Sequence, residues 1–150
     1  MASTVQWRLM FRVANRAAFD KCLVRTLPLL GAGCEAGDGR PYWKIPELWE
    51  CAVTVPAGGG SAAEQVLGCL LSAQRLASGW YIRGTLSAEC ADGFGGVFAA
   101  GQGGSASKVP GLEWASFDVV AGQAEPSAAA DRGRGVGFWE FIGPSRGPGC

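Results

Sequence analysis

The chain of 150 residues contains no histidine, the side chain best suited to proton transfer near neutral pH. This absence excludes Ser-His-Asp and Cys-His nucleophile arrangements and removes the common zinc sites. The chain also lacks an excess of either charge, because 13 basic residues balance 13 acidic residues. Nucleic-acid binders and polybasic membrane anchors carry a basic surplus, so we expect neither a nucleic-acid nor a membrane partner.

Long hydrophobic runs are missing as well. No stretch approaches the roughly 20 apolar residues of a membrane-spanning helix, and the first residues do not have the pattern of a signal peptide. These absences predict a cytoplasmic protein. The six cysteines include no CxxC pair, so we interpret them as structural or incidental thiols and predict no disulfide framework, metal site or cofactor.

What the sequence does contain is an alternation of apolar and polar side chains in several segments. This period of two is typical of strands in a half-buried antiparallel sheet. Most tryptophans fall on the apolar side of their alternation, so Trp7, Trp49, Trp80 and Trp114 are expected to lie in the core. The predicted strands are residues 5–13, 48–55, 80–90, 94–101 and 112–120, and the dipeptide Asp92-Gly93 predicts a hairpin turn between the third and the fourth of them. The loop before residue 48 leaves room for a short edge strand at residues 42–45.

Helical periodicity occupies two of the intervals between these strands. Asn15 is expected to cap a helix whose apolar stripe runs from Phe19 to Leu30. A second helix is predicted over residues 62–77, and Gly79 is placed where a left-handed cap would end it. The apolar stripe of this second helix is predicted to consist of Val66, Leu67, Leu70, Leu71 and either Ala73 or Gln74, and Cys69 is also expected on it.

The predicted order is therefore strand, helix, strand, helix, strand, strand, strand. A mostly antiparallel sheet with two helices on one face, of the ferredoxin-like or a related type, accounts best for this order and predicts an α+β fold. We assign one domain to residues 1–121. Residues 122–150 are rich in Gly, Ala and Pro and predict a flexible extension, in which the apolar residues 137–143 form a docking segment.

The glycines Gly58, Gly59 and Gly60 lie between a predicted strand and a helix, which is the place of a phosphate-binding loop. They match a dinucleotide fingerprint only loosely, and no lysine follows them as a Walker loop requires. Ser61 and Glu64 instead form the S-x-x-E pattern of a capping box, in which each side chain bonds a backbone N–H group. We interpret the glycines as a mobile connection to a capped helix.

If both helices cover one face of the sheet, the opposite face is a candidate site. Its mixture of arginine, tyrosine and methionine with scattered acidic residues is typical of protein-contact surfaces, and it also fits an ordinary solvated face. Trp43, in an irregular segment, is predicted to be an aromatic anchor. The predicted partner-binding residues are Arg8, Met10, Arg12, Trp43, Glu50, Tyr81, Arg83 and Glu89, and no catalytic residue is predicted.

Two segments, ELWECAVTV and GWYIRGTLSAEC, flank the capped second helix. In size, element order and composition, residues 5–120 resemble the immunity proteins with which bacteria neutralise toxins delivered between cells. The resemblance implies a non-catalytic cytoplasmic protein that binds one cognate toxin and blocks its active site. A second reading stays open: a small ligand-binding or catalytic domain, dimeric through its sheet, with a pocket between sheet and helices whose polar groups include Glu50, Tyr81, Arg83 and Asp118.

Overall fold

The computed structural model describes residues 3–84 and 91–122. In this part of the chain two helices and nine strands follow one another. Their bounds are β1 Thr4–Arg12, α1 Arg16–Leu30, β2 Glu35–Ala36, β3 Arg40–Pro41, β4 Leu48–Pro56, α2 Ala62–Leu76, β5 Ala77–Ser78, β6 Tyr81–Arg83, β7 Gly95–Ala99, β8 Ala106–Ser107 and β9 Leu112–Val120.

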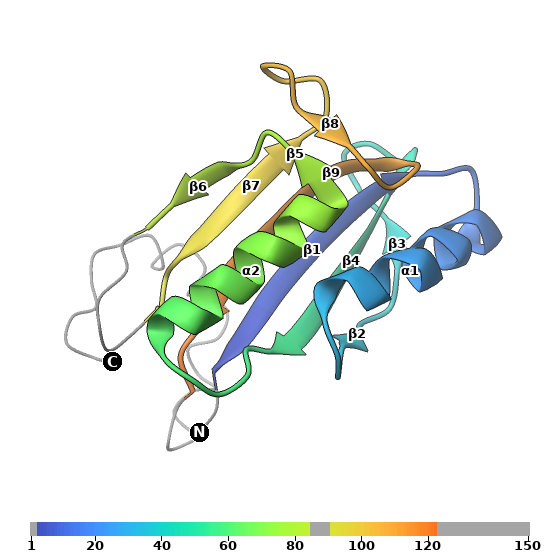
Figure 1. Ribbon diagram of the computed structural model, residues 1–150. Coiled ribbons are helices and arrows are strands. Elements are labelled where there is room, and N and C mark those ends of the chain that lie inside the picture. The colour runs from blue at the N-terminus through green and yellow to red at the C-terminus, as the bar shows by residue number, and fades with distance from the viewer. Residues whose placement is uncertain (1–2, 85–90, 123–150) are drawn as a thin grey trace.

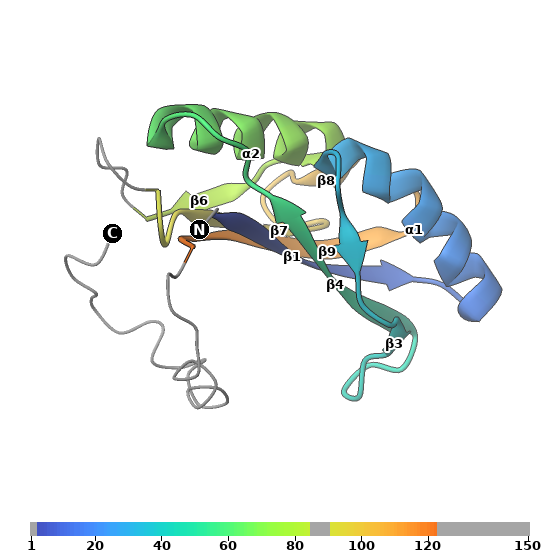
Figure 2. The same cartoon turned by 90° about the horizontal axis from the view of Figure 1, so that it is seen from below.

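Seven strands form one antiparallel sheet in the order β2-β4-β1-β9-β7-β6, with β3 also paired to β4. Both helices lie on the same face of this sheet, as Figure 1 and Figure 2 show. The predicted α+β fold with a mostly antiparallel sheet is therefore confirmed. The ferredoxin-like arrangement is not confirmed, because β1 and β4, which flank α1, are direct neighbours instead of being split by another strand.

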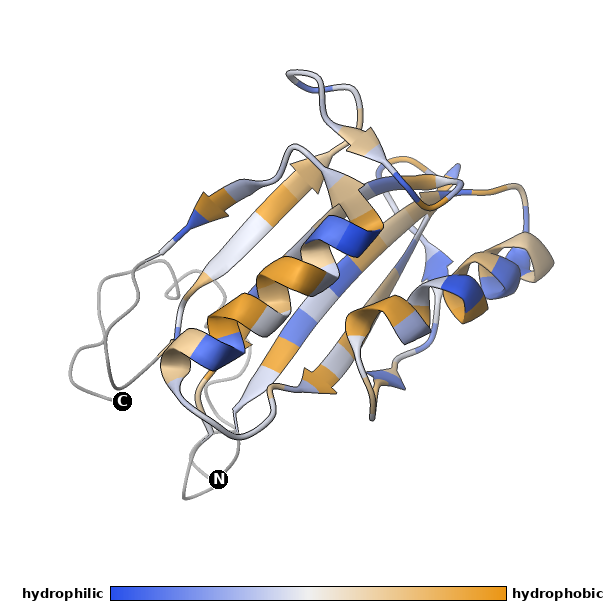
Figure 3. Cartoon of the chain, viewed as in Figure 1, coloured by the Kyte–Doolittle hydropathy of each residue, from blue (hydrophilic) through white to orange (hydrophobic). Residues whose placement is uncertain are grey.

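β1 is the central strand, since it pairs with β4 on one side and with β9 on the other. Apolar and polar residues alternate along it (Figure 3), so successive side chains point to opposite faces of the sheet. Trp7, Leu9 and Phe11 point toward the helices and are at most 1% exposed. The rings of Phe117 and Trp80 lie 5.0 and 6.1 Å from the Trp7 ring, so an aromatic cluster fills the centre of the core.

Both helices begin as the sequence predicts. The side chain of Asn15 accepts a hydrogen bond from the Ala18 backbone N–H group at the start of α1. At the start of α2, the Ser61 hydroxyl accepts from the Glu64 N–H group and the Glu64 carboxylate accepts from the Ser61 N–H group. The capping box is confirmed, and its side chains occupy two N–H groups that a phosphate at this helix would need.

The end of α2 differs from the prediction. The residue that caps it is Ala77 in an extended conformation, which continues directly into β5, so Gly79 does not end the helix. The face of α2 that packs on the sheet agrees with the predicted stripe at Val66, Cys69 and Ala73 and differs from it at two leucines. Leu67 and Leu71 are 55% and 49% exposed, whereas Cys69, Ala73 and Leu76 are buried with Val66.

Several short strands were also placed wrongly. The edge strand predicted at residues 42–45 is absent from that segment, and β2 and β3 pair with β4 instead. Within the predicted strand at residues 80–90, only β6 is a strand among the described residues. Asp92-Gly93 does form a turn, in which the Phe94 N–H group donates to the Ala91 carbonyl. The hairpin of β6 and β7 is longer than this turn, because its last paired residues are Arg83 and Gly95. The predicted extension at 122–150 lies, apart from its first residue, outside the described residues.

The capping box gives a stability prediction. Ser61→Ala should lower the free energy of unfolding by about 1 kcal/mol, because the Glu64 N–H group loses its acceptor. Ser61→Asp is the matched control, since its carboxylate can accept the same bond and suits the helix dipole. Urea denaturation followed by circular dichroism measures both variants. Equal stability of Ser61→Ala and the wild type would contradict the capping role.

Candidate functional site

The sheet surface opposite the helices, called the open face below, collects the predicted partner-binding residues. Cross-strand register places β1, β4, β9, β7 and β6 side by side on it. Among the described residues no helix covers this surface (Figure 2). The open face is made by Gln6, Arg8, Met10, Arg12, Arg40, Glu50, Ala52, Thr54, Tyr81, Arg83, Val97, Ala99, Trp114, Ser116 and Asp118.

The predicted residues fall into two groups on the open face. Arg8, Met10 and Glu50 lie together, because Met10 pairs directly with Glu50 in the register of β1 with β4. Tyr81 and Arg83 lie on β6, at the far edge of the sheet. Met10 and Glu50 are each only 9% exposed, so neither offers much surface to a partner. Of the remaining three, Arg12 faces the same side from the end of β1, Trp43 lies in a loop, and Glu89 lies outside the described residues.

Glu50 is held between two arginines. Arg8 donates from Nη2 to one carboxylate oxygen at 2.9 Å, and Arg40 donates from Nε to the other at 3.2 Å. Arg40 reaches Glu50 because the two residues are direct partners in the register of β3 with β4. Buried carboxylates need such partners, since an unpaired charge away from water is costly. Glu50 therefore fixes the orientation of two partly exposed guanidinium groups.

A second ion pair crosses a whole strand. Arg83 on β6 donates to the Asp118 carboxylate on β9 at 2.6 Å, over the intervening β7. Gly95 is the β7 residue between them, and a side chain on it would collide with the Asp118 carboxylate. Burial raises the pKa of Asp118 above its ordinary value, and the neighbouring Arg83 partly offsets the rise. Glycine at this position thus makes the long-range pair sterically feasible.

An apolar centre lies between the two ion-paired groups. Trp114 pairs with Met10 on one side and with Ala99 on the other, and Val97 pairs with Tyr81. The prediction that Trp114 belongs to the core is wrong, because it is half-buried on the open face. The register of β1 with β9 shifts between Met10 and Phe11. Because of this shift, Leu112 pairs with Phe11 and lies on the side of the sheet that the helices cover. Tyr81 is 70% exposed at the edge of this centre.

Trp43 lies in the loop between β3 and β4, which projects from the side of the sheet opposite the helices (Figure 2). Trp43 is 76% exposed. The Lys44 ammonium group lies 5.0 Å from the ring centroid, and the Tyr42 ring centroid lies 6.2 Å away. Cation–π contact with a neighbouring lysine restricts the orientation of an otherwise solvated tryptophan.

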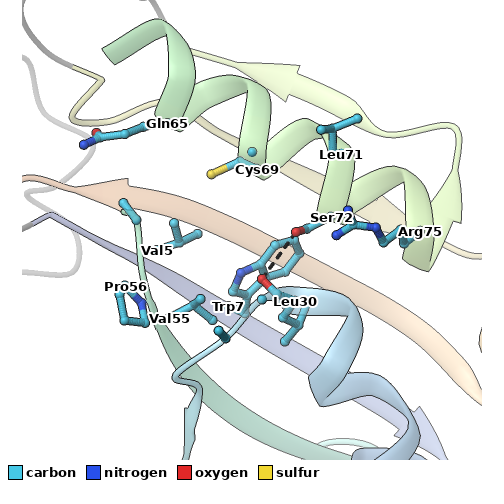
Figure 4. A pocket seen from close by; sticks show the side chains of 14 residues that line it. Val5, Trp7, Leu30, Val55, Pro56, Gln65, Cys69, Leu71, Ser72 and Arg75 are labelled. Carbon is cyan, nitrogen blue, oxygen red and sulfur yellow. Dashed lines mark hydrogen bonds between the residues drawn. The ribbon is translucent and has the colours of Figure 1, made fainter. Parts of the chain in front are cut away.

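A separate cavity of about 230 Å³ lies on the other side of the sheet, between β1, β4 and the two helices (Figure 4). The second reading of the sequence assigned Glu50, Tyr81, Arg83 and Asp118 to such a cavity. This assignment is wrong, because all four residues belong to the open face and none lines the cavity. The residues that do line it gave no recognisable pattern in the sequence, since they come from four separate segments.

The four cysteines in the described part of the chain, Cys22, Cys34, Cys51 and Cys69, are free thiols. Burial raises the pKa of Cys34 and Cys51 and raises that of Cys69 to about 11. Thiols with raised pKa values are poor nucleophiles at neutral pH. Within residues 3–84 and 91–122, no three potential metal-ligating side chains lie together.

Comparison with protein families, with curated proteins and with solved structures finds no match to this chain. Neither of the helices in the described residues is long and apolar enough to cross a membrane.

The raised pKa of Asp118 predicts how stability depends on pH. The folded protein binds the proton of the Asp118 carboxyl group more tightly than the unfolded chain does. Protonated Asp118 therefore stabilises the fold at low pH, and this stabilisation is lost as the pH rises through the folded-state pKa. Asp118→Asn keeps a neutral side chain at every pH. Between about pH 3 and pH 7, the stability of Asp118→Asn relative to the wild type should therefore increase in urea titrations.

A second variant separates the two causes of this shift. Arg83→Met removes the neighbouring charge and should raise the pKa of Asp118 further, as measured by NMR titration of the carboxyl carbon. A lower pKa of Asp118 in Arg83→Met, or a loss of relative stability in Asp118→Asn with rising pH, would contradict this account.

Proposed function

We propose that this chain is a non-catalytic protein-binding module whose open face is its contact surface. The observation that carries the proposal is the one-sided covering of the sheet, which leaves aromatic and small apolar side chains unpartnered among the described residues. Trp114, Val97 and Tyr81 form an apolar centre, and the ion pairs of Glu50 and Asp118 lie on either side of it. An apolar, aromatic centre with an arginine-rich polar rim is the usual anatomy of protein interfaces.

The size of the open face suits such a contact. Five long or medium strands at about 4.8 Å spacing give a width of roughly 20 Å, and a nine-residue strand is about 30 Å long. The face therefore covers about 600 Å² at most, which approaches the roughly 800 Å² that each partner contributes to an interface of standard size. Trp43, from the loop on the same side, extends this surface beyond the edge of the sheet.

The charges of the open face point to contact by shape more than by net charge. Its arginines Arg8, Arg12, Arg40 and Arg83 each pair with a carboxylate of the same chain. Pairs of this kind fix the side chains and leave little unbalanced charge to steer a partner over long distances. Aromatic anchors at Tyr81 and Trp43 would then supply much of the binding free energy.

The specific form that we propose is neutralisation of a toxin in the cytoplasm by steric occlusion. Support comes from the resemblance noted in the sequence and from the fit of a broad, ion-paired surface to a folded protein domain. A partner of this kind is sought among proteins encoded beside this chain's gene, by co-expression and co-purification. A candidate toxin must also arrest growth when expressed alone and fail to do so in the presence of this protein.

The decisive prediction concerns which face the partner touches. Tyr81→Ala and Trp43→Ala should each weaken binding of the co-purified partner by about tenfold or more, because both remove large exposed aromatic side chains. Leu67→Ala is the matched control, since Leu67 is a similarly exposed apolar residue on the helix side. Isothermal titration calorimetry measures all three variants, and their circular dichroism spectra should be unchanged.

Other outcomes would overturn the proposal. Weakening by Leu67→Ala alone would show that the helix side is the contact surface. A dimer in light scattering that Tyr81→Ala dissociates would show that the open face binds a second copy of this chain instead of a toxin.

A further inference from the structure

We infer that the cavity on the helix side of the sheet binds a small, apolar carboxylic acid. The cavity lies between α2, the last residues of α1 and the strands β1 and β4 (Figure 4). Apolar side chains provide its floor and mouth, including those of Val5, Val55 and Leu71. It is separate from the open face, so this site does not depend on the proposed protein contact.

A buried donor without a partner is the first observation behind this inference. Trp7 lines the cavity and is 1% exposed, yet its indole N–H group meets no hydrogen-bond acceptor among the described residues. The indole of Trp80 is different, since it donates to the carbonyl groups of Ala73 and Ala77. Figure 4 shows the ring nitrogen of Trp7 on the side that faces Val55 across the cavity. Buried donors are rarely left without an acceptor, and indole can only donate, so this N–H group needs an acceptor oxygen, which we assign to the ligand.

A cation at one end of the cavity is the second observation. Arg75 lines the cavity and donates to the Leu29 carbonyl at 3.3 Å, and no carboxylate of the described residues pairs with it. Beside it, Ser72 donates to the Leu30 carbonyl, so both side chains also tie α2 to the end of α1. A guanidinium group has five N–H donors in a fixed fork, so Arg75 retains donors for an anion.

The remaining lining limits the rest of the ligand to an apolar body. Cys69 is 4% exposed in the cavity wall, and burial raises its pKa to about 11, so it stays a neutral thiol. Leu71 is 49% exposed at the cavity. A hydrocarbon chain lying along α2 would cover Leu71 and extend toward Gln65, at the end opposite Arg75 (Figure 4).

The volume of the cavity limits the size of the ligand. At about 30 Å³ for each water-sized group, a cavity of about 230 Å³ holds about eight such groups. This volume is below that of sites for drug-sized ligands. Octanoate, with a carboxylate and a short alkyl chain, is the probe that we choose. Its ten non-hydrogen atoms slightly exceed the number of such groups that the cavity holds, so the end of its chain would reach the mouth of the cavity at Leu71.

The test measures octanoate binding to the full chain by NMR and calorimetry. Octanoate should shift the indole N–H resonance of Trp7, which Trp7→Phe identifies by its disappearance, and should raise the melting temperature. Octanol and octylamine, which lack the anion, should bind at least about tenfold more weakly. Arg75→Leu should weaken octanoate binding by a similar factor, and Arg75→Lys, which keeps the charge, should weaken it less.

A blocking variant locates the site. Gly68 lies in α2 at the cavity, and a Cβ added to it meets no atom within 4 Å, so Gly68→Trp can extend over the cavity without a backbone clash. Gly68→Trp should abolish octanoate binding, whereas Leu67→Trp, one residue away and outside the cavity lining, should not.

Three results would overturn the inference. The first is that Gly68→Trp still binds octanoate. The second is that octanol and octanoate bind with equal affinity. The third is that octanoate does not shift the Trp7 indole resonance and that the indole N–H group contacts a bound water instead. None of these results bears on the open face, because Tyr81 and Trp43 lie on the other side of the sheet.

Discussion

The antiparallel pairing of β1 with both β4 and β9 is the constraint on which the other features depend. Side chains alternate between the two faces of the sheet along β1. Because β4 and β9 both pair with β1, the register also decides which of their side chains lie on each face. Trp7 faces the helices and its neighbour Arg8 faces the opposite side. A slip of one residue would put Arg8 into the core and Trp7 into solvent, so burial of the aromatic cluster strongly favours the observed register.

Elements governed by local chemistry were predictable from the sequence. The alternation of residues 5–13 and 112–120, the Asn15 cap and the Ser61 capping box each act through neighbours in the chain, and the structure confirms them. The short strands were not predictable, because pairing with β4 creates β2 and β3 at residues that have no strand pattern of their own. The outward position of Leu67 and Leu71 also follows from packing, because the periodicity of α2 does not show which edge of its apolar stripe meets the sheet.

The open face was predictable only in part for a similar reason. Period two places Arg8 and Glu50 on one surface once the helices take the other. The partners of these side chains depend on strand order, however, so Arg40 was missed as a second partner of Glu50. Asp118 was predicted for the cavity, because no local pattern shows that Arg83 reaches it over Gly95.

The same alternation keeps the two proposed binding sites physically separate. Arg8 contributes to the open face through Glu50, whereas Trp7 turns its indole toward the cavity, although the two residues share a peptide bond. Side chains of α2 can therefore change the cavity without contacting the open face, and side chains of β6 can change the open face without contacting the cavity. Substitutions at sites this far apart are usually additive in free energy. Any coupling measured between the two ligands would consequently have to pass through β1 and β4, because both strands contribute residues to the cavity and to the open face.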